Sequence, residues 1–281
     1  MDRGIFYSVG ITALMLILGN NVTIEEIIKS FLTVTFNQYW YFSAYTGLFL
    51  IMPILNCFIQ KMDKENLVKV LIVAVLVYSL YGMFGIRLGN PLGLNSGYSV
   101  VWLAFLYVIG AYIRRYKLYE MVTKKKLIVI ISSSVFINVL WKLFIGRVLG
   151  HGIDNLFISY VSPTMLAMSI GLLLLFSTLK LDDFFVKSVK FLGPTIFGIY
   201  LIHDHNLFRR YIMANNFIFV DKFNFITIPF IIFSIIIVIF IFCVLIERIR
   251  IRLFKILMVR NFSEKVGSVL NLIINKISLI F

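Results

Sequence analysis

The sequence predicts an all-α integral membrane protein, with about eight transmembrane helices in one bundle and a C-terminal interfacial amphipathic helix. Of its 281 residues, 60% are hydrophobic and only 14% are charged. Apolar runs of about 20 residues recur along the chain, and this is the length that crosses a bilayer as a helix. A membrane-spanning barrel would instead show alternating segments of about 10 residues, which this sequence lacks.

Eight apolar runs are expected to cross the membrane. They lie near residues 4–20, 40–60, 66–86, 98–113, 127–145, 158–179, 191–210 and 225–246. Residues 1–246 are therefore predicted to form one transmembrane domain. The tail, residues 247–281, begins with ERIRIRLFKILMVR, where charged and apolar positions alternate. This pattern is typical of a helix in the membrane interface, here on the cytoplasmic side.

The distribution of lysine and arginine supports this topology. With the N-terminus in the cytoplasm, 20 of the 27 basic residues lie inside and 7 lie outside. Cytoplasmic loops of membrane proteins carry such an excess, so both termini of this multi-pass chain are predicted to be cytoplasmic. The net charge of +14 then reflects topology and contact with membrane lipid, and no nucleic-acid partner is expected.

Residues 191–210, FLGPTIFGIYLIHDHNLFRR, place His203, Asp204 and His205 at the end of an apolar run. An ionisable group at membrane depth costs roughly 2.5 kcal/mol or more unless it is paired or faces water, so a functional role is the first hypothesis. The alternative is that the triplet satisfies its own hydrogen bonds within the bundle. We expect the helix to begin near Pro194, since proline suits a first helical turn.

On a continuous helix His203 shares a face with Tyr200, and His205 shares one with Arg209. The cation of Arg209 would keep His205 neutral, and a neutral imidazole is a competent general base. The two histidines would point away from each other and could not share a metal ion. Cys57 and Cys243 lie in apolar runs, so neither a metal cluster nor a disulfide is predicted.

Two further groups of side chains are candidates for binding. Trp40, Tyr41 and Tyr45 lie where the chain enters the membrane from outside, as in an interfacial aromatic belt. The cytoplasmic loop at residues 114–126 is strongly basic; its cluster is Arg114, Arg115, Lys124, Lys125 and Lys126. Such a cluster usually sets topology or contacts anionic lipid, and the sharper hypothesis is that it receives a phosphorylated co-substrate.

The segment GIYLIHDHNLFRR resembles a late span of the bacterial membrane acyltransferase family 3, the O-acetyltransferases of cell-surface polysaccharides. NQYWYFSAYTGLFLIMPILN, GYSVVWLAFLYVIGAYIRRY and SYVSPTMLAMSIGLLLLFS resemble other family segments in the same order. The family's catalytic element is an arginine about ten residues before a histidine in its first span. This chain has no histidine before His151, and its first run resembles the family's third span. The resemblance therefore implies either a shortened relative that lacks the first two spans or a misassigned or internal start at Met1.

The resemblance implies an O-acyltransferase of the bacterial inner membrane, with acetyl-CoA as donor substrate and no tightly bound cofactor. The acceptor would be a polysaccharide or a lipid-linked sugar. In this interpretation His203 or His205 is the catalytic base, and Tyr200, Asp204 and Arg209 bind substrate. The aromatic group would line the sugar site and the basic cluster would meet the phosphates of acetyl-CoA. Two alternatives stay open: a transporter or polymerase component for lipid-linked oligosaccharide, and an inactive shortened family member.

Overall fold

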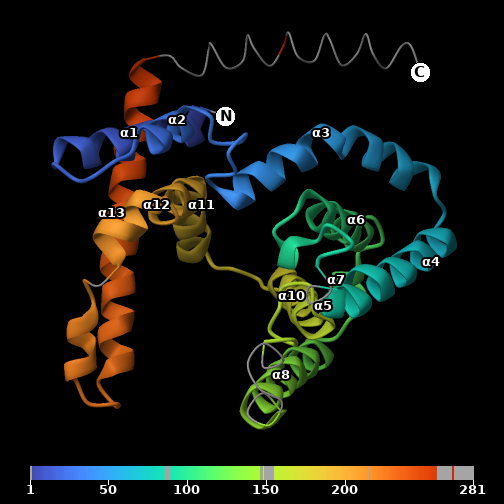
Figure 1. Cartoon of the computed structure of the whole chain (residues 1–281). Helices are drawn as coiled ribbons and strands as arrows, with labels where there is room; N and C mark the ends of the chain where they lie inside the picture. Colours follow the sequence, from blue (N-terminus) through green and yellow to red (C-terminus); the bar gives the residue numbers. More distant parts are fainter. Residues whose placement is uncertain are drawn as a thin grey trace. The chain divides into compact units, whose positions relative to one another are not determined.

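The protein is described by a computed structural model that covers residues 2–85, 89–145, 148, 155–214, 216–257 and 268. Every regular element in these residues is a helix, which confirms the all-α prediction (Figure 1). The chain forms two compact units. The terminal unit combines Met1–Thr33 with Asp182–Phe281, and the middle unit is the continuous segment Val34–Leu181.

The predicted number of spans is wrong. In the described residues, five helical stretches are long and apolar enough to cross a membrane: Trp40–Lys61, Lys64–Gly85, Lys124–Phe144, Asp183–His203 and Ile228–Ile256. The other three predicted spans are helices of 16, 16 and 15 residues. At 1.5 Å per residue these reach about 24 Å or less, short of a hydrocarbon core of about 30 Å. The five longer helices are enough to make the protein multi-pass.

Five helices begin at a side chain that caps them, which explains where these runs become helical. Thr23, Asp63, Ser99, Ser162 and Asp182 each accept a hydrogen bond from a backbone N–H in the first turn of the helix that follows. The first turn of a helix leaves N–H groups without internal partners, and these oxygens satisfy one of them.

The terminal unit contains two long helices, α11 and α13, that pack against each other where they cross (Figure 1). α1 packs against α11 and against the short helix α12. The helices of this unit are α1 (Asp2–Ile17), α2 (Ile24–Phe31), α11 (Asp183–His203), α12 (Asn206–Phe208), the π-helical η5 (Arg209–Met213), the 3-10 helix η6 (Ile218–Lys222) and α13 (Ile228–Ile256).

The sequence places a span at 191–210, whereas α11 begins at Asp183 and carries Pro194 inside it. The cap at Asp182 starts the helix earlier than the proline would. α13 runs unbroken through the boundary predicted between residues 246 and 247. Beyond residue 257 the tail lies outside the described residues apart from Ser268, so its interfacial placement stays a prediction.

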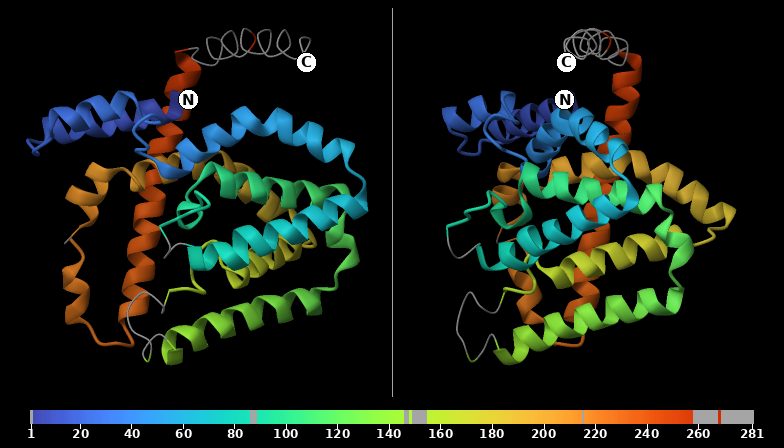
Figure 2. Two further views of the ribbon diagram at one scale, coloured as in Figure 1. Left: turned by 45° about the vertical axis from the view of Figure 1, so that its right-hand side comes forward. Right: turned by 90° about the vertical axis from the view of Figure 1, so that its right-hand side faces the viewer.

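The middle unit is built from helix pairs, α3 with α6 and α8 with α10, which lie side by side in the views of Figure 2. Its helices are α3 (Trp40–Lys61), α4 (Lys64–Ala74), the π-helical η1 (Val75–Tyr81), α5 (Gly82–Gly85), the 3-10 helix η3 (Asn95–Gly97), α6 (Val100–Arg115), α7 (Leu118–Met121), α8 (Lys124–Leu140), the π-helical η4 (Trp141–Ile145) and α10 (Pro163–Ser177).

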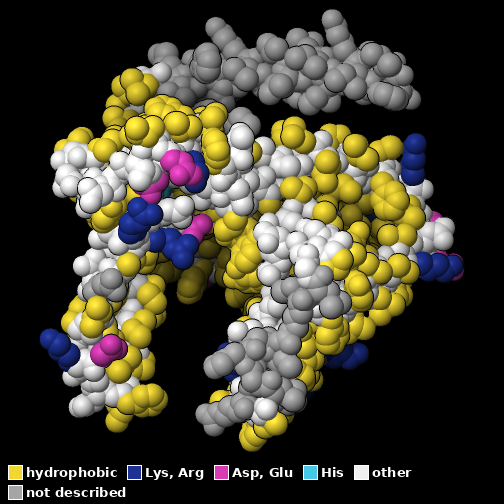
Figure 3. Space-filling view, viewed as in Figure 1, with side chains coloured by type: hydrophobic (Ala, Val, Ile, Leu, Met, Phe, Trp, Pro, Cys, Tyr) yellow, Lys and Arg dark blue, Asp and Glu magenta, His cyan; other side chains and the backbone are white. Residues whose placement is uncertain are grey.

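Hydrophobic side chains cover much of the surface of both units, as Figure 3 shows. Large apolar residues such as Phe49, Phe136 and Phe230 are exposed. In water such a surface would drive aggregation, but lipid tails solvate it. The exposed surface therefore agrees with the membrane placement.

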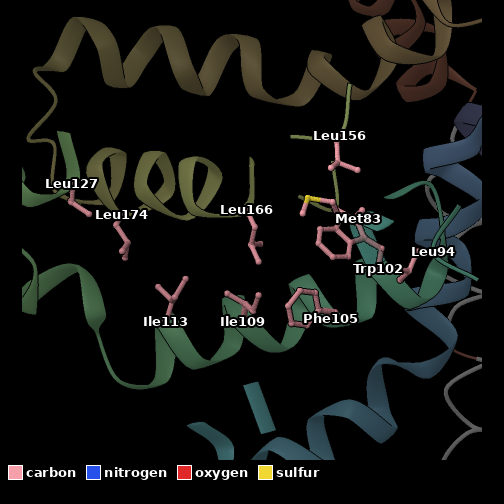
Figure 4. Packing of buried hydrophobic residues seen from close by; sticks show 11 residues of the cluster. Met83, Leu94, Trp102, Phe105, Ile109, Ile113, Leu127, Leu156, Leu166 and Leu174 are labelled. Atoms are coloured by element: carbon pink, nitrogen blue, oxygen red, sulfur yellow. The ribbon is translucent and has the colours of Figure 1, made fainter. Parts of the chain in front are cut away.

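The core of the middle unit joins α6 to α10. Ile109 and Ile113 of α6 point toward Leu166 and Leu174 of α10 (Figure 4). Ser79 of η1 donates a hydrogen bond of 2.6 Å to the backbone carbonyl of Val161, just before α10. Since lipid removes most of the hydrophobic gain on packing, close contact and such hydrogen bonds hold the helices together.

Candidate active site

The histidine triplet lies at a break between two helices and not on one continuous helix. α11 ends at His203, Asp204 is its C-terminal cap, and His205 has an extended backbone that starts α12. The predicted shared face of His205 and Arg209 is wrong, because His205 is buried whereas the side chain of Arg209 is 62% exposed. Nδ1 of His205 accepts a hydrogen bond from the N–H of Leu207 at 3.2 Å, so its ring acts as a helix cap.

His205 is buried, with 1% of its surface exposed. Its ring also forms a hydrogen bond with the backbone of Ser8 in α1 that favours the protonated ring, so the acceptor is a carbonyl. Both ring nitrogens are then engaged, Nδ1 as acceptor and Nε2–H as donor. The hydrogen bond of His205 to Ser8 therefore links the turn after α11 to α1.

His205 lies beyond the candidate span that ends at His203, and burial lowers its pKa from 6.5 to about 4. The carbonyl of Ser8 and the carboxylate of Glu26 oppose this shift only in part. The prediction that the cation of Arg209 keeps His205 neutral is wrong, because Arg209 pairs with Asp204. Loss of hydration of the charged ring is the physical reason.

We expect this buried neutral ring to make the folded protein less stable in acid. Its folded-state pKa lies below its unfolded value, so its contribution is complete above pH 6.5 and is lost as the pH falls toward 4. The loss should approach, at most, about 3 kcal/mol. Thermal unfolding in detergent should show it, and His205→Asn, which caps the helix without titrating, should flatten this part of the pH profile. Identical profiles for the two proteins would contradict the expectation.

His203 is half-buried and its ring is oriented by the backbone. Nδ1 lies 2.8 Å from the carbonyl oxygen of Ile199. A carbonyl only accepts, so Nδ1 carries the hydrogen, and in the neutral ring Nε2 keeps the lone pair. In the described residues Nε2 has no hydrogen-bond partner. The ring of Tyr200 meets it edge-on, with centroids 6.2 Å apart.

Two ion pairs surround this turn. Oδ1 of Asp204 and Nη1 of Arg209 are 3.4 Å apart, and Nη1 of Arg210 lies 2.8 Å from Oε1 of Glu26 in α2. Burial raises the pKa of Glu26, but the N–H of Thr23 and the charge of Arg210 outweigh it and leave the pKa below its ordinary value. Figure 3 shows acidic and basic side chains beside one another in this part of the terminal unit. The pair of Arg210 and Glu26 holds α2 to η5, and the pair of Asp204 and Arg209 joins the end of α11 to η5.

A buried charged cluster in the same unit was not identified from the sequence. Glu247 of α13 is 0% exposed, and Arg250 is 4% exposed. Arg250 donates to both carboxylate oxygens of Glu247, from Nε at 2.7 Å and from Nη2 at 2.6 Å. The hydroxyl of Tyr7 in α1 donates to the same carboxylate, and Arg3 lies 3.8 Å from it. Glu247 is thus satisfied by three side chains from two helices.

Gly198 of α11 makes room for this carboxylate. A methyl carbon at Gly198 would overlap the carboxylate of Glu247 and lie 2.8 Å from its Cγ. Gly198 is five residues before His203, so the cluster is about 7.5 Å along α11 from the histidine turn. One signal was present in the sequence: Glu247 is the single acidic residue between Asp221 and Glu264.

The predicted aromatic group lies in the middle unit. Trp40 contacts Tyr41 at 5.5 Å, and Tyr41 stacks with Tyr45 at 6.1 Å between ring centroids. Two tyrosines that the sequence did not single out extend the group: Tyr98 meets Trp40 at 4.3 Å, and Tyr160 meets Tyr98 at 5.3 Å. Three segments far apart in sequence therefore form one aromatic surface.

The predicted basic cluster also belongs to the middle unit. Arg114 and Arg115 end α6, and Arg115 donates to the carbonyl of Met62 at 3.1 Å. Lys124, Lys125 and Lys126 are exposed in the first turn of α8. Cations there oppose the helix dipole, so a bound anion would relieve an unfavourable arrangement. The histidine turn belongs to the terminal unit, whereas the aromatic and basic groups belong to the middle unit.

No group of three or more His, Cys, Asp or Glu side chains that could hold a metal ion occurs in the described residues. The free thiol of Cys243 is buried and that of Cys57 is exposed.

Comparison with known proteins gave one result. The family model described as "Acyltransferase domain", of acyltransferase family 3, matches residues 4–248. No curated protein and no solved structure matches the chain. The match covers both units and includes the aromatic group, the basic cluster, the histidine turn and Glu247.

Proposed function

Since the chain belongs to acyltransferase family 3 and is a membrane acyltransferase, we propose that it transfers an acetyl group from acetyl-CoA to a sugar hydroxyl. The acceptor is a cell-surface polysaccharide or a lipid-linked sugar. The enzyme resides in the bacterial inner membrane. Cytoplasmic placement of both termini, which the basic bias of the predicted inner loops favours, needs an even number of crossings, so at least one of the shorter helices α1, α6 and α10 would have to cross beside the five longer ones.

His203 is the general base in this proposal, and one observation carries that choice. Its Nδ1–H is held by the carbonyl of Ile199 at 2.8 Å, which leaves Nε2 as a proton acceptor. His205 instead is buried, with both nitrogens engaged. A base must reach the proton that it removes, so the half-buried ring suits the role better.

The proposed reaction is a direct acyl transfer. Nε2 of His203 takes the proton of the sugar hydroxyl while the oxygen attacks the thioester carbonyl carbon. The C–S bond then breaks, and the thiolate of CoA takes the proton back from the imidazolium. Arg209, paired with Asp204, orients the acceptor beside Tyr200.

The basic cluster and the aromatic group supply the binding contacts. Phosphate groups of acetyl-CoA would meet Arg114 and the lysines Lys124, Lys125 and Lys126, which are exposed. The aromatic faces of Trp40, Tyr41 and Tyr45 suit the apolar faces of pyranose rings, as stacked aromatic side chains do in other binding sites.

Radiolabelled acetyl-CoA and membranes that contain the protein test this function. We expect alkali-labile label in envelope glycan, and His203→Gln should lower the initial rate by about 100-fold or more. Asn206→Gln, at an exposed position three residues away, is the matched control and should keep the wild-type rate. Absence of labelled glycan with wild-type protein would refute the transfer, whereas an unchanged rate in His203→Gln would refute only the base.

A further inference from the structure

A hydrophobic groove of about 290 Å³ lies in the middle unit. Its walls come from residues 51–58 of α3, 70–78 of α4 and η1, and 100–108 of α6. Small side chains at Ala74 and Ala104 leave the space open, and every lining side chain is hydrophobic apart from the hydroxyl of Tyr78. A polar ligand would lose its hydrogen bonds to water here without replacement.

The walls belong largely to Trp40–Lys61 and Lys64–Gly85, two of the helical stretches that can cross a membrane. Their surroundings are hydrocarbon, and an apolar cavity does not hold water. The wall of α3 from Ile51 to Phe58 is about 10 Å long. A groove with apolar walls of this length and volume fits a hydrocarbon chain.

One end of the groove carries positive charge. Lys61 follows the α3 wall by three residues, Lys64 precedes the α4 wall by six, and Arg115 follows the α6 wall by seven. The ring of Tyr116 brings two of them together, because Lys64 Nζ and Arg115 Cζ lie 5.3 and 5.4 Å from its centroid. All three helices thus present a cation at the same end.

Neighbouring carboxylates leave this charge uncompensated. Asp63 caps α4 by accepting from the N–H of Asn66 at 2.8 Å, and Glu65 pairs with Lys69 at 2.7 Å. Neither Lys61 nor Lys64 has a carboxylate partner in the described part of the chain.

We propose that this groove and its basic end bind one anionic phospholipid of the membrane. An acyl chain fills the groove, and the phosphate meets Lys61, Lys64 and Arg115. Charge-assisted hydrogen bonds to phosphate suit both lysine and arginine. The lipid is neither donor nor acceptor in the proposed reaction, and Arg115 is the one member of the basic cluster that its phosphate would contact.

The experiment uses the full chain, delipidated in detergent and titrated with phosphatidylglycerol or phosphatidylcholine, with native mass spectrometry to count bound lipid. We expect one phosphatidylglycerol per chain and much weaker binding of phosphatidylcholine. Ala104→Phe fills the groove and should abolish binding. Lys61→Gln with Lys64→Gln should weaken phosphatidylglycerol binding by about 10-fold or more.

Two matched controls add the same changes elsewhere. Val139→Phe enlarges a side chain of α8 that is 47% exposed, and Lys187→Gln removes an exposed charge from α11. Both should bind phosphatidylglycerol as the wild type does. If Ala104→Phe does not fold, the double lysine variant decides. Equal binding of the two lipids, retention by the double variant, or one-for-one displacement by acetyl-CoA would overturn the proposal.

Discussion

Replacing Glu247 by alanine is expected to destabilise the folded protein by about 3–5 kcal/mol. The change leaves Arg250, which is 4% exposed, as a buried cation without its carboxylate, and it removes the acceptor of the Tyr7 hydroxyl. Breaking one partner of a buried ion pair costs far more than losing the pair's net attraction. Thermal unfolding in detergent, with the folded fraction measured by size-exclusion chromatography, checks this result.

Glu65→Ala is the matched control for that variant. Glu65 pairs with Lys69 at 2.7 Å on an exposed helix surface, one turn apart. Such exposed pairs contribute less than about 0.5 kcal/mol, so the midpoint of unfolding should hardly move. Equal small shifts for the two alanine variants would show that the cluster around Glu247 is not a buried network.

Gly198→Ala is the second variant with a large expected effect. The added methyl group overlaps the Glu247 carboxylate, and overpacking of this kind costs typically about 1–3 kcal/mol. The upper part of that range is expected, because the carboxylate is held by Tyr7 and Arg250 and has nowhere to move. Unfolding in the same detergent measures it.

Gly193→Ala provides the control on the same helix. Nothing lies within 4 Å of a methyl group at Gly193, so the alanine should stabilise α11 by about 0.5–1 kcal/mol. Gly198→Ala combined with Glu247→Asp, which shortens the acid, should regain part of the loss. If both glycine variants behaved alike, the close contact between α11 and α13 would be disproved.

Much of the helical architecture follows from sequence, because each predicted span overlaps a helix, although the span at 191–210 runs past the end of α11. The number of helices that can cross a membrane does not follow from the sequence, because an apolar window does not show where a helix stops. α10, for example, starts only at the cap provided by Ser162 and ends after 15 residues.

The candidate site was predictable in part. The histidine turn stood out because ionisable residues are rare in apolar runs. The sequence did not show that α11 ends at His203. This end depends on the ring of His205 as a helix cap and on a contact with Ser8, which is far away in sequence. Glu247 was assigned to an amphipathic tail because only tertiary contacts with Tyr7 and Gly198 show that it is buried.

The hydrogen bond from Tyr7 to Glu247 joins positions 240 residues apart, at the two ends of the chain. The middle unit, by contrast, is one continuous segment. Because a nascent chain leaves the ribosome from its N-terminus, Val34–Leu181 is complete before translation reaches residue 182. The tyrosine of α1 therefore lacks this acceptor until α13 has been synthesised.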